Sequence, residues 1–203
     1  MIYNIIVILF SFLVPTVIIK EPITKLIKNE KVSFKDYKFE IISYILLVIG
    51  CLTRIVGINM YPQGLNPDKA SSAYEAYSIL EYGMDRNGHV LPVFLEAWGS
   101  GQNALYTYIM IPFIKILGVN LISTRLPMAL ISSISLFVWY KILAKIKDKK
   151  FTIVGLAFFV ICPWHIMKSR WGLESNIFPD FTLYAVYFVI KFIETKRHRY
   201  FYI

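Results

Sequence analysis

The stretch NLISTRLPMALISSISLFVWYKI, residues 120–142, decides the fold class of this protein. An α-helix needs about 20 predominantly apolar residues to cross a hydrocarbon layer roughly 30 Å thick. This stretch has them, and its two charged residues, Arg125 and Lys141, lie toward its two ends. It therefore predicts a transmembrane helix.

Four further apolar runs have the same character. They cover 2–19, 41–58, 151–167 and 177–193. The composition agrees with them, because 57% of the 203 residues are hydrophobic and 17% are charged, whereas soluble domains carry about 25% charged residues. We expect an all-α fold, a multi-pass transmembrane helical bundle with five crossings.

The net charge of +9 is concentrated in three basic stretches, 20–38, 141–150 and 191–199. Each adjoins a predicted crossing, as cytoplasmic loops do under the positive-inside rule. The charge therefore reports topology, with the lipid bilayer as partner, and it excludes a nucleic-acid-binding surface. With these stretches inside the cell, residues 59–119 form a large external loop, and we expect a multi-pass protein of the cell (plasma) membrane.

The external loop should contain an amphipathic helix near its start. Asn66 is a favourable N-cap, Pro67 suits the first helical position, and Gly83 is a plausible stop. One face is apolar, and we expect it to pack against the membrane surface or the bundle; it carries Ala70, Ala73, Tyr74, Tyr77, Leu80 and Met84. The opposite, polar face carries Asp68, Ser71, Ser72, Glu75 and Ser78.

The apolar run 103–117 should be a second interfacial helix rather than a crossing. As a helix it reaches only about 22 Å, and Pro112 and Lys115 interrupt it. If it crossed the bilayer, the lysines of 141–150 would lie outside the cell. Between the two helices, glycines and a proline predict an irregular connection of about twenty residues, a length that is usually functional.

Asp68 is the first candidate for chemistry. It would lie in the first turn of a helix, where the positive end of the helix dipole and free backbone N–H groups favour the ionised carboxylate. A carboxylate there can accept a proton from an incoming hydroxyl or amine as a general base. The alternative is that Asp68 only supports the start of the helix.

Arg170 and Glu174 are the second candidates, since they follow run 151–167 and emerge on the same outer face. Arg170 could hold a phosphate, or it could pair with Glu174 at i, i+4 if the stretch is helical. Arg125 lies in an apolar run, where an ionisable residue is either functional or snorkels to the lipid headgroups. The histidines show no metal-ligand spacing, so we expect no metal.

Three runs, in this order, resemble a known family of membrane enzymes. They are YPQGLNPDKASSAYEAYSILEYGMDRNGHVLP (61–92), YTYIMIPFIKILGVNLISTRLP (106–127) and PWHIMKSRWGLESN (163–176). They are similar to bacterial membrane glycosyltransferases related to the protein O-mannosyltransferases and to the lipid A aminoarabinose transferases. The resemblance covers about residues 41 to 195 and implies the type C glycosyltransferase fold.

The resemblance also implies an activity, the transfer of a hexosyl or pentosyl group from a polyprenyl-phosphate sugar to an acceptor on the outer face. Asp68 matches the family's acidic residue at the start of the first interfacial helix, which implies a role in activating the acceptor. Lys69 stands where a glutamate often follows. Arg125, Arg170 and Glu174 match polar positions that imply substrate binding, and no cofactor is implied beyond the donor.

Family members are several hundred residues long, so we expect this chain to be the N-terminal part of such an enzyme. Residues 1–40 would form a membrane anchor and a basic cytoplasmic loop, and residues 41–203 the first part of the membrane domain. The chain would then be incomplete as an enzyme and could need a complementary C-terminal chain. The alternative is a non-catalytic truncated remnant or a membrane assembly partner.

Overall fold

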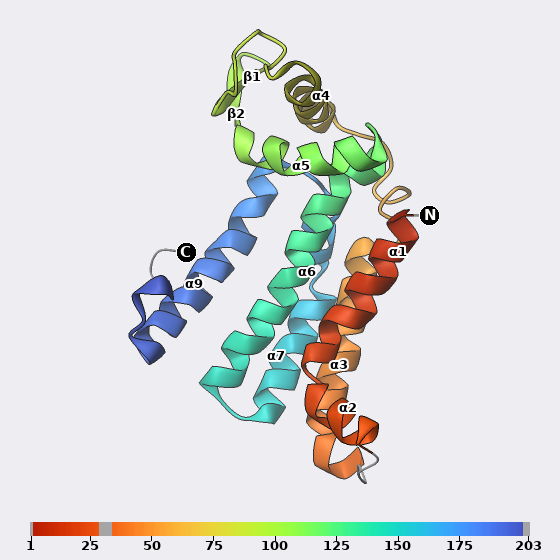
Figure 1. Cartoon of the computed structure of the whole chain (residues 1–203), viewed down its shortest axis with the longest axis vertical. Helices are drawn as coiled ribbons and strands as arrows, with labels where there is room; N and C mark the ends of the chain where they lie inside the picture. The colour runs from red at the N-terminus through yellow and green to blue at the C-terminus, as the bar shows by residue number, and fades with distance from the viewer. Residues whose placement is uncertain (1, 29–33, 201–203) are drawn as a thin grey trace. The chain divides into compact units, whose positions relative to one another are not determined.

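A computed structural model of the chain describes residues 2–28 and 34–200 (Figure 1). Residues 29–33, in the predicted basic loop 20–38, lie outside the described residues. The chain forms two compact units, each built from separate segments of the sequence. The first contains 1–56, 133–166 and 183–203, and the second contains 57–132 and 167–182.

The regular elements described in the first unit are all helices. Its elements are α1 (Ile2–Ile8), η1 (Leu9–Leu13), η2 (Val14–Val17), α2 (Lys20–Ile27), α3 (Phe34–Ile55), α7 (Lys149–Ile161), η4 (His198–Tyr200) and parts of α6 (Leu121–Ile146), α8 (Pro163–Ser169) and α9 (Phe178–Thr195). Gly50 lets α3 pack closely, because a Cβ there would lie 2.6 Å from Leu136 and 3.2 Å from Val160.

Arg54 on α3 is fully buried and closes the end of α7. Its guanidinium donates to the carbonyls of Phe159 and Val160 at 3.1 and 3.3 Å, and its Nε donates to His165 Nδ1 at 3.0 Å. The last carbonyls of a helix lack partners within it, and Pro163 cannot continue the hydrogen bonding of α7. Arg54 therefore stabilises the point where α7 bends by 55° into α8.

Two described helices are long and apolar enough to cross a membrane, α6 and Glu174–Thr195, or three if α7 and α8 together form one bent span. They correspond to the predicted crossings 120–142, 177–193 and 151–167. Run 2–19 forms shorter helical pieces, Ile2–Val17. Run 41–58 lies largely within α3, whose charge-free part lies between Glu40 and Arg54. A multi-pass bundle is thus plausible, and the first two crossings stay a prediction.

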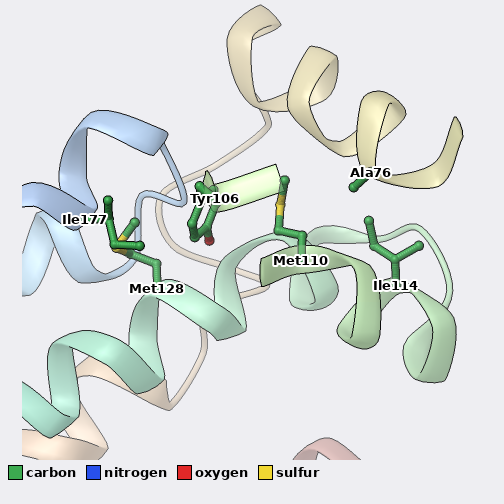
Figure 2. Packing of buried hydrophobic residues seen from close by; sticks show 6 residues of the cluster. All are labelled: Ala76, Tyr106, Met110, Ile114, Met128 and Ile177. Atoms are coloured by element: carbon green, nitrogen blue, oxygen red, sulfur yellow. The ribbon is translucent and has the colours of Figure 1, made fainter. Parts of the chain in front are cut away.

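The second unit contains α4 (Pro67–Tyr82), β1 (Phe94–Ala97), β2 (Ser100–Asn103), α5 (Ala104–Leu117), η3 (Glu174–Ile177) and the first turns of α6 and α9. In Figure 1, α5 runs across the start of α6. Residues from α4, α5, α6 and η3 share one core: Ala76, Tyr106, Met110, Ile114, Met128 and Ile177 (Figure 2). Tyr106 is buried with its hydroxyl donating to Thr124 O at 2.7 Å.

Helix α4 begins and ends where the sequence predicts. The Asn66 side chain accepts a hydrogen bond from Lys69 N at 3.0 Å, and Gly83 at φ 70° closes the helix. Tyr74 and Tyr77 on the predicted apolar face are exposed, so they do not pack inside the unit, and the other alternative, packing against the membrane surface, stays a prediction. The buried positions are Lys69, Ser71, Ser72, Ala73, Glu75, Ala76, Ser78 and Ile79.

The polar face of α4 is buried for two reasons, the small size of its side chains and the pairing of its polar groups. Serine and alanine side chains let the neighbouring backbone approach closely, whereas tyrosines at the same positions would hold it away. The buried polar groups find partners, as such groups must. Ser72 Oγ donates to Gln102 Oε1 on β2 at 3.1 Å, and Glu75 pairs with Arg86. Whether the tyrosine face meets lipid stays a prediction.

The predicted irregular connection contains a hairpin, which departs from the all-helical prediction. Strands β1 and β2 pair antiparallel, with Ala97 opposite Ser100. The two residues between them, Trp98 and Gly99, both have positive φ, 53° and 77°. Two such residues between paired strands make a tight turn of the primed type, which matches the twist of the strands.

Helix α5 forms over 104–117, within the predicted second helix. The Asn103 side chain accepts from Leu105 N at 2.8 Å at its start, and Gly118 N donates to Ile114 O at its end. Asn120 then starts α6, because its side-chain oxygen accepts from Ile122 N at 2.8 Å. At 14 residues, α5 is shorter than a typical span. Its place in the outer interface stays a prediction.

Candidate functional site

All four residues singled out by the sequence belong to the second unit. Asp68 lies in the first turn of α4 and is half-buried. Within the described part of the chain, its carboxylate has no hydrogen bond or ion pair, while its backbone carbonyl lies 3.0 Å from Ser72 Oγ. The carboxylate is therefore available at a helix N-terminus, where the dipole favours negative charge.

Arg125 is fully buried near the start of α6 and does not snorkel to a headgroup. Its Nη1 donates to Ile58 O at 2.6 Å, and its Nη2 donates to Gly64 O. Both carbonyls belong to the loop that leads into α4. Arg125 therefore fixes the path of this loop, which in turn places the helix start that carries Asp68.

Lys69 is the residue that the sequence reasoning missed. It is 2% exposed, and its Nζ lies 4.1 Å above the centroid of the Trp171 ring. Burial, followed by the positive charge of Arg125, lowers the pKa of Lys69 to about 8. The helical spacing carried the signal, because Lys69 lies on the same face as the buried Ala73 and Ala76.

Arg170 follows the end of α8, and its N–H donates to Met167 O at 3.2 Å. Its guanidinium lies against Gly57, where a Cβ would be 3.9 Å from Nη2. Arg170 is near enough to Arg125 for the two charges to repel, as Lys69 is. Lys69, Arg125 and Arg170 thus form one cationic cluster, with Trp171 packed against its lysine.

Glu174 begins η3, and the segment before it is not helical, because α8 ends at Ser169. The condition for a helical i, i+4 pair with Arg170 is therefore not met. Gly172 has no room for a Cβ, which would run into Thr124 O and the Tyr106 hydroxyl. The segment between Arg170 and Glu174 can therefore lie this close to Thr124 and Tyr106 only with glycine at position 172.

The Glu174 carboxylate lies at a hollow of about 380 Å³. Its Oε2 is buried and has no hydrogen-bond partner among the described residues. The other lining residues are largely apolar and include Leu105, Phe178 and Phe181. A buried carboxylate oxygen at a hollow can accept a hydrogen bond from a bound hydroxyl.

A buried ion pair fixes the segment that carries Arg170. Lys168 Nζ pairs with Asp180 Oδ2, which also accepts from Ser132 Oγ at 2.9 Å. Asn176 Nδ2 donates to Trp171 O at 2.7 Å. Sequence reasoning did not single out this pair, although two opposite charges inside an apolar region could have signalled it.

A metal site is not evident in the described ranges, because no three His, Cys, Asp or Glu side chains there could hold a metal ion. The site instead consists of one carboxylate at a helix start and a neighbouring cationic cluster. Such a set can accept a proton and can bind a phosphate group.

Residues 103–203 match the family described as dolichyl-phosphate-mannose-protein mannosyltransferase. No curated protein and no solved structure matches the chain. The matched residues include Arg125, Arg170 and Glu174, whereas Asp68 and Lys69 precede them. The match and the apolar helices support a membrane glycosyltransferase similar to the protein mannosyltransferases.

Proposed function

We propose that this chain is part of a glycosyltransferase that moves a sugar from a polyprenyl phosphate to an acceptor on the outer face of the cell membrane. One observation carries the proposal. The contact between Lys69 Nζ and the Trp171 ring brings the helix start that holds Asp68 to the segment that holds Arg170. This contact supports one site in which Asp68 is the general base and the cationic cluster binds the phosphate.

In the proposed reaction, the Asp68 carboxylate takes the proton of the acceptor hydroxyl. The acceptor oxygen forms a bond to the anomeric carbon of the sugar, and the bond from that carbon to the phosphate oxygen breaks. The polyprenyl phosphate leaves with the bonding electrons. Lys69 and Arg170 offset its negative charge, a stabilisation that is stronger in a site with little water.

The other two residues have supporting roles in this proposal. Arg125 positions the loop before α4 through the carbonyls of Ile58 and Gly64. Glu174 accepts a hydrogen bond from a substrate hydroxyl at its hollow.

The second candidate is an assembly partner for a complementary chain, without catalysis of its own. The apolar surface of α9 favours it, because Val186, Val189 and Ile193 are each about half exposed or more. In a membrane, such a surface is covered by lipid or by further helices. This candidate predicts no effect of the cationic cluster on donor binding.

Binding of the donor's phosphate lipid tests the proposal directly. The chain in lipid nanodiscs is titrated with undecaprenyl phosphate, and bound lipid is counted by native mass spectrometry. Arg170→Met should weaken binding about tenfold or more, because Arg170 is the partly exposed cation of the cluster and a charge-assisted contact is lost. Lys115→Met changes an exposed lysine of the same unit and should leave binding unchanged. Equal binding by the wild type and both variants would show that the cationic cluster does not recognise the donor.

A further inference from the structure

The turn of the β1–β2 hairpin contains a residue whose backbone conformation does not suit its side chain. Trp98 has φ 53° and is followed by Gly99 at φ 77°. The first position of such a turn favours Asn, Asp or Gly, which tolerate left-handed backbone. A bulky residue there is an outlier, and outliers of this kind recur at ligand-binding sites.

Burial of the Trp98 side chain does not compensate for its unfavourable backbone conformation. It is 72% exposed, and the nearby Phe94 ring is 58% exposed. Both rings line an open hollow of about 630 Å³. An exposed aromatic pair beside a hollow offers flat apolar surface to a ligand.

Polar side chains complete the lining. Arg86, Asn87, Glu96 and Ser100 face the same hollow. Asn87 Nδ2 donates to Glu96 Oε2 at 3.4 Å, so an amide and a carboxylate lie next to each other. The hollow therefore combines aromatic faces with planar hydrogen-bonding groups, whereas a surface that enters lipid would lack these charges.

The neighbouring chain holds these groups in place. Glu75 on α4 pairs with the Arg86 guanidinium and accepts from Arg86 N at 3.0 Å. Asp85 Oδ1 accepts from the backbone N–H groups of Asn87 and His89 at 2.9 and 2.8 Å. Such contacts fix a site before its ligand arrives, which reduces the entropy lost on binding.

Phe94 is held from the other side of the hairpin. A Cβ at Gly101 would run into the Phe94 ring, so the ring lies directly over this glycine. The aromatic face is thus supported by backbone rather than by a mobile side chain. Both hairpin arms contribute to the same preformed surface.

We propose that this hollow is a carbohydrate subsite that binds an uncharged oligosaccharide. The C–H faces of sugar rings pack on Trp98 and Phe94, and sugar hydroxyls bond to Asn87 and Glu96. A ligand without acidic groups fits best, because the Arg86 charge is already balanced by Glu75 and Glu96 adds a carboxylate that can accept from hydroxyls. The proposed function is needed only for the ligand's role, which would be that of a glycan acceptor. Binding itself can be measured without sugar transfer.

Saturation-transfer NMR tests the subsite with the full chain in phosphatidylcholine nanodiscs. The probes are maltotetraose and chitotetraose, and at least one should bind. Trp98→Asn should weaken binding tenfold or more, although asparagine suits the turn better and keeps the hairpin folded. Tyr82→Ala removes another exposed aromatic of the same unit, outside the hollow, and should leave binding unchanged.

Two outcomes would overturn the subsite. One is that neither probe binds the wild-type chain, and the other is that Trp98→Asn binds as well as wild type. A membrane anchor is tested in a variant whose other three tryptophans are phenylalanine. Quenching of Trp98 by brominated lipids, without saccharide binding, would assign the hairpin to the membrane instead. Loss of donor binding with retained saccharide binding would refute the transferase and leave the subsite standing.

Discussion

Replacing Lys69 by methionine should stabilise the protein. Burial lowers the pKa of Lys69 from 10.5 to about 8, and each pH unit between the two values corresponds to about 1.4 kcal/mol. The buried ammonium therefore costs on the order of 3 kcal/mol at neutral pH. Its contact with the Trp171 ring returns up to about 2 kcal/mol. Methionine has a similar length and needs no charge, so Lys69→Met should gain about 1–2 kcal/mol.

The pH dependence gives the same prediction a second readout. A lysine whose pKa is lower in the folded state binds fewer protons there than in the unfolded state between pH 8 and 10.5. Stability then rises with pH over this window, and the cost is fully present below pH 8. The free energy of unfolding of the wild type should thus approach that of Lys69→Met as pH rises from 8 to 10. Below pH 8 the difference between the two proteins should be constant.

Denaturant unfolding in detergent micelles, at several pH values, measures both effects. Lys115→Met is the matched control, since Lys115 is an exposed lysine in the same unit. It should change the free energy of unfolding by less than about 0.5 kcal/mol. The reasoning is refuted if Lys69→Met is less stable than wild type at pH 7, with a difference that does not change with pH.

Two further predictions concern the buried ion pair and the topology. Asp180→Asn removes the carboxylate that faces Lys168 and should destabilise the protein by about 3 kcal/mol. The same unfolding assay measures this effect. A change below about 0.5 kcal/mol would mean that the fold does not need the ion pair. Cysteines introduced at Asn87 and Lys147, with Cys51 and Cys162 replaced, should differ toward an impermeant thiol reagent on intact cells. Labelling at 87 alone agrees with an external loop 59–119, whereas labelling at 147 alone contradicts it.

Local signals in the sequence predicted the ends of the helices well. Asn66, Pro67 and Gly83 act on the backbone beside them, so the bounds of α4 follow from neighbours in sequence. The packing face of α4 depends on β2, Arg86 and α5, which lie farther along the chain. Hydrophobic periodicity assigned Tyr74 and Tyr77 to a face that packs on the membrane surface or the bundle, and the structure leaves them exposed and buries the serine face instead.

In the candidate site, too, local features could be predicted and contacts between distant segments could not. Asp68 could be chosen from its place in a first helical turn. Helical spacing signals the face of Lys69, but its contact with Trp171 comes from a distant segment of the chain. The non-helical segment between Arg170 and Glu174 packs tightly against Thr124 at Gly172. Such contacts between distant segments are decided by tertiary packing, which one sequence does not display.

The most direct test of the proposed activity is sugar transfer by a complete enzyme that carries this region, with Asp68→Asn. The assay follows a radiolabelled sugar from a polyprenyl-phosphate donor to acceptor in membranes at equal expression. Asparagine keeps the helix start intact but cannot take the acceptor's proton, so the rate should fall about a hundred- to ten-thousand-fold. Glu81→Gln, an exposed carboxylate on the same helix, should transfer at the wild-type rate. Transfer by Asp68→Asn near the wild-type rate would contradict the proposed role of Asp68 as the general base.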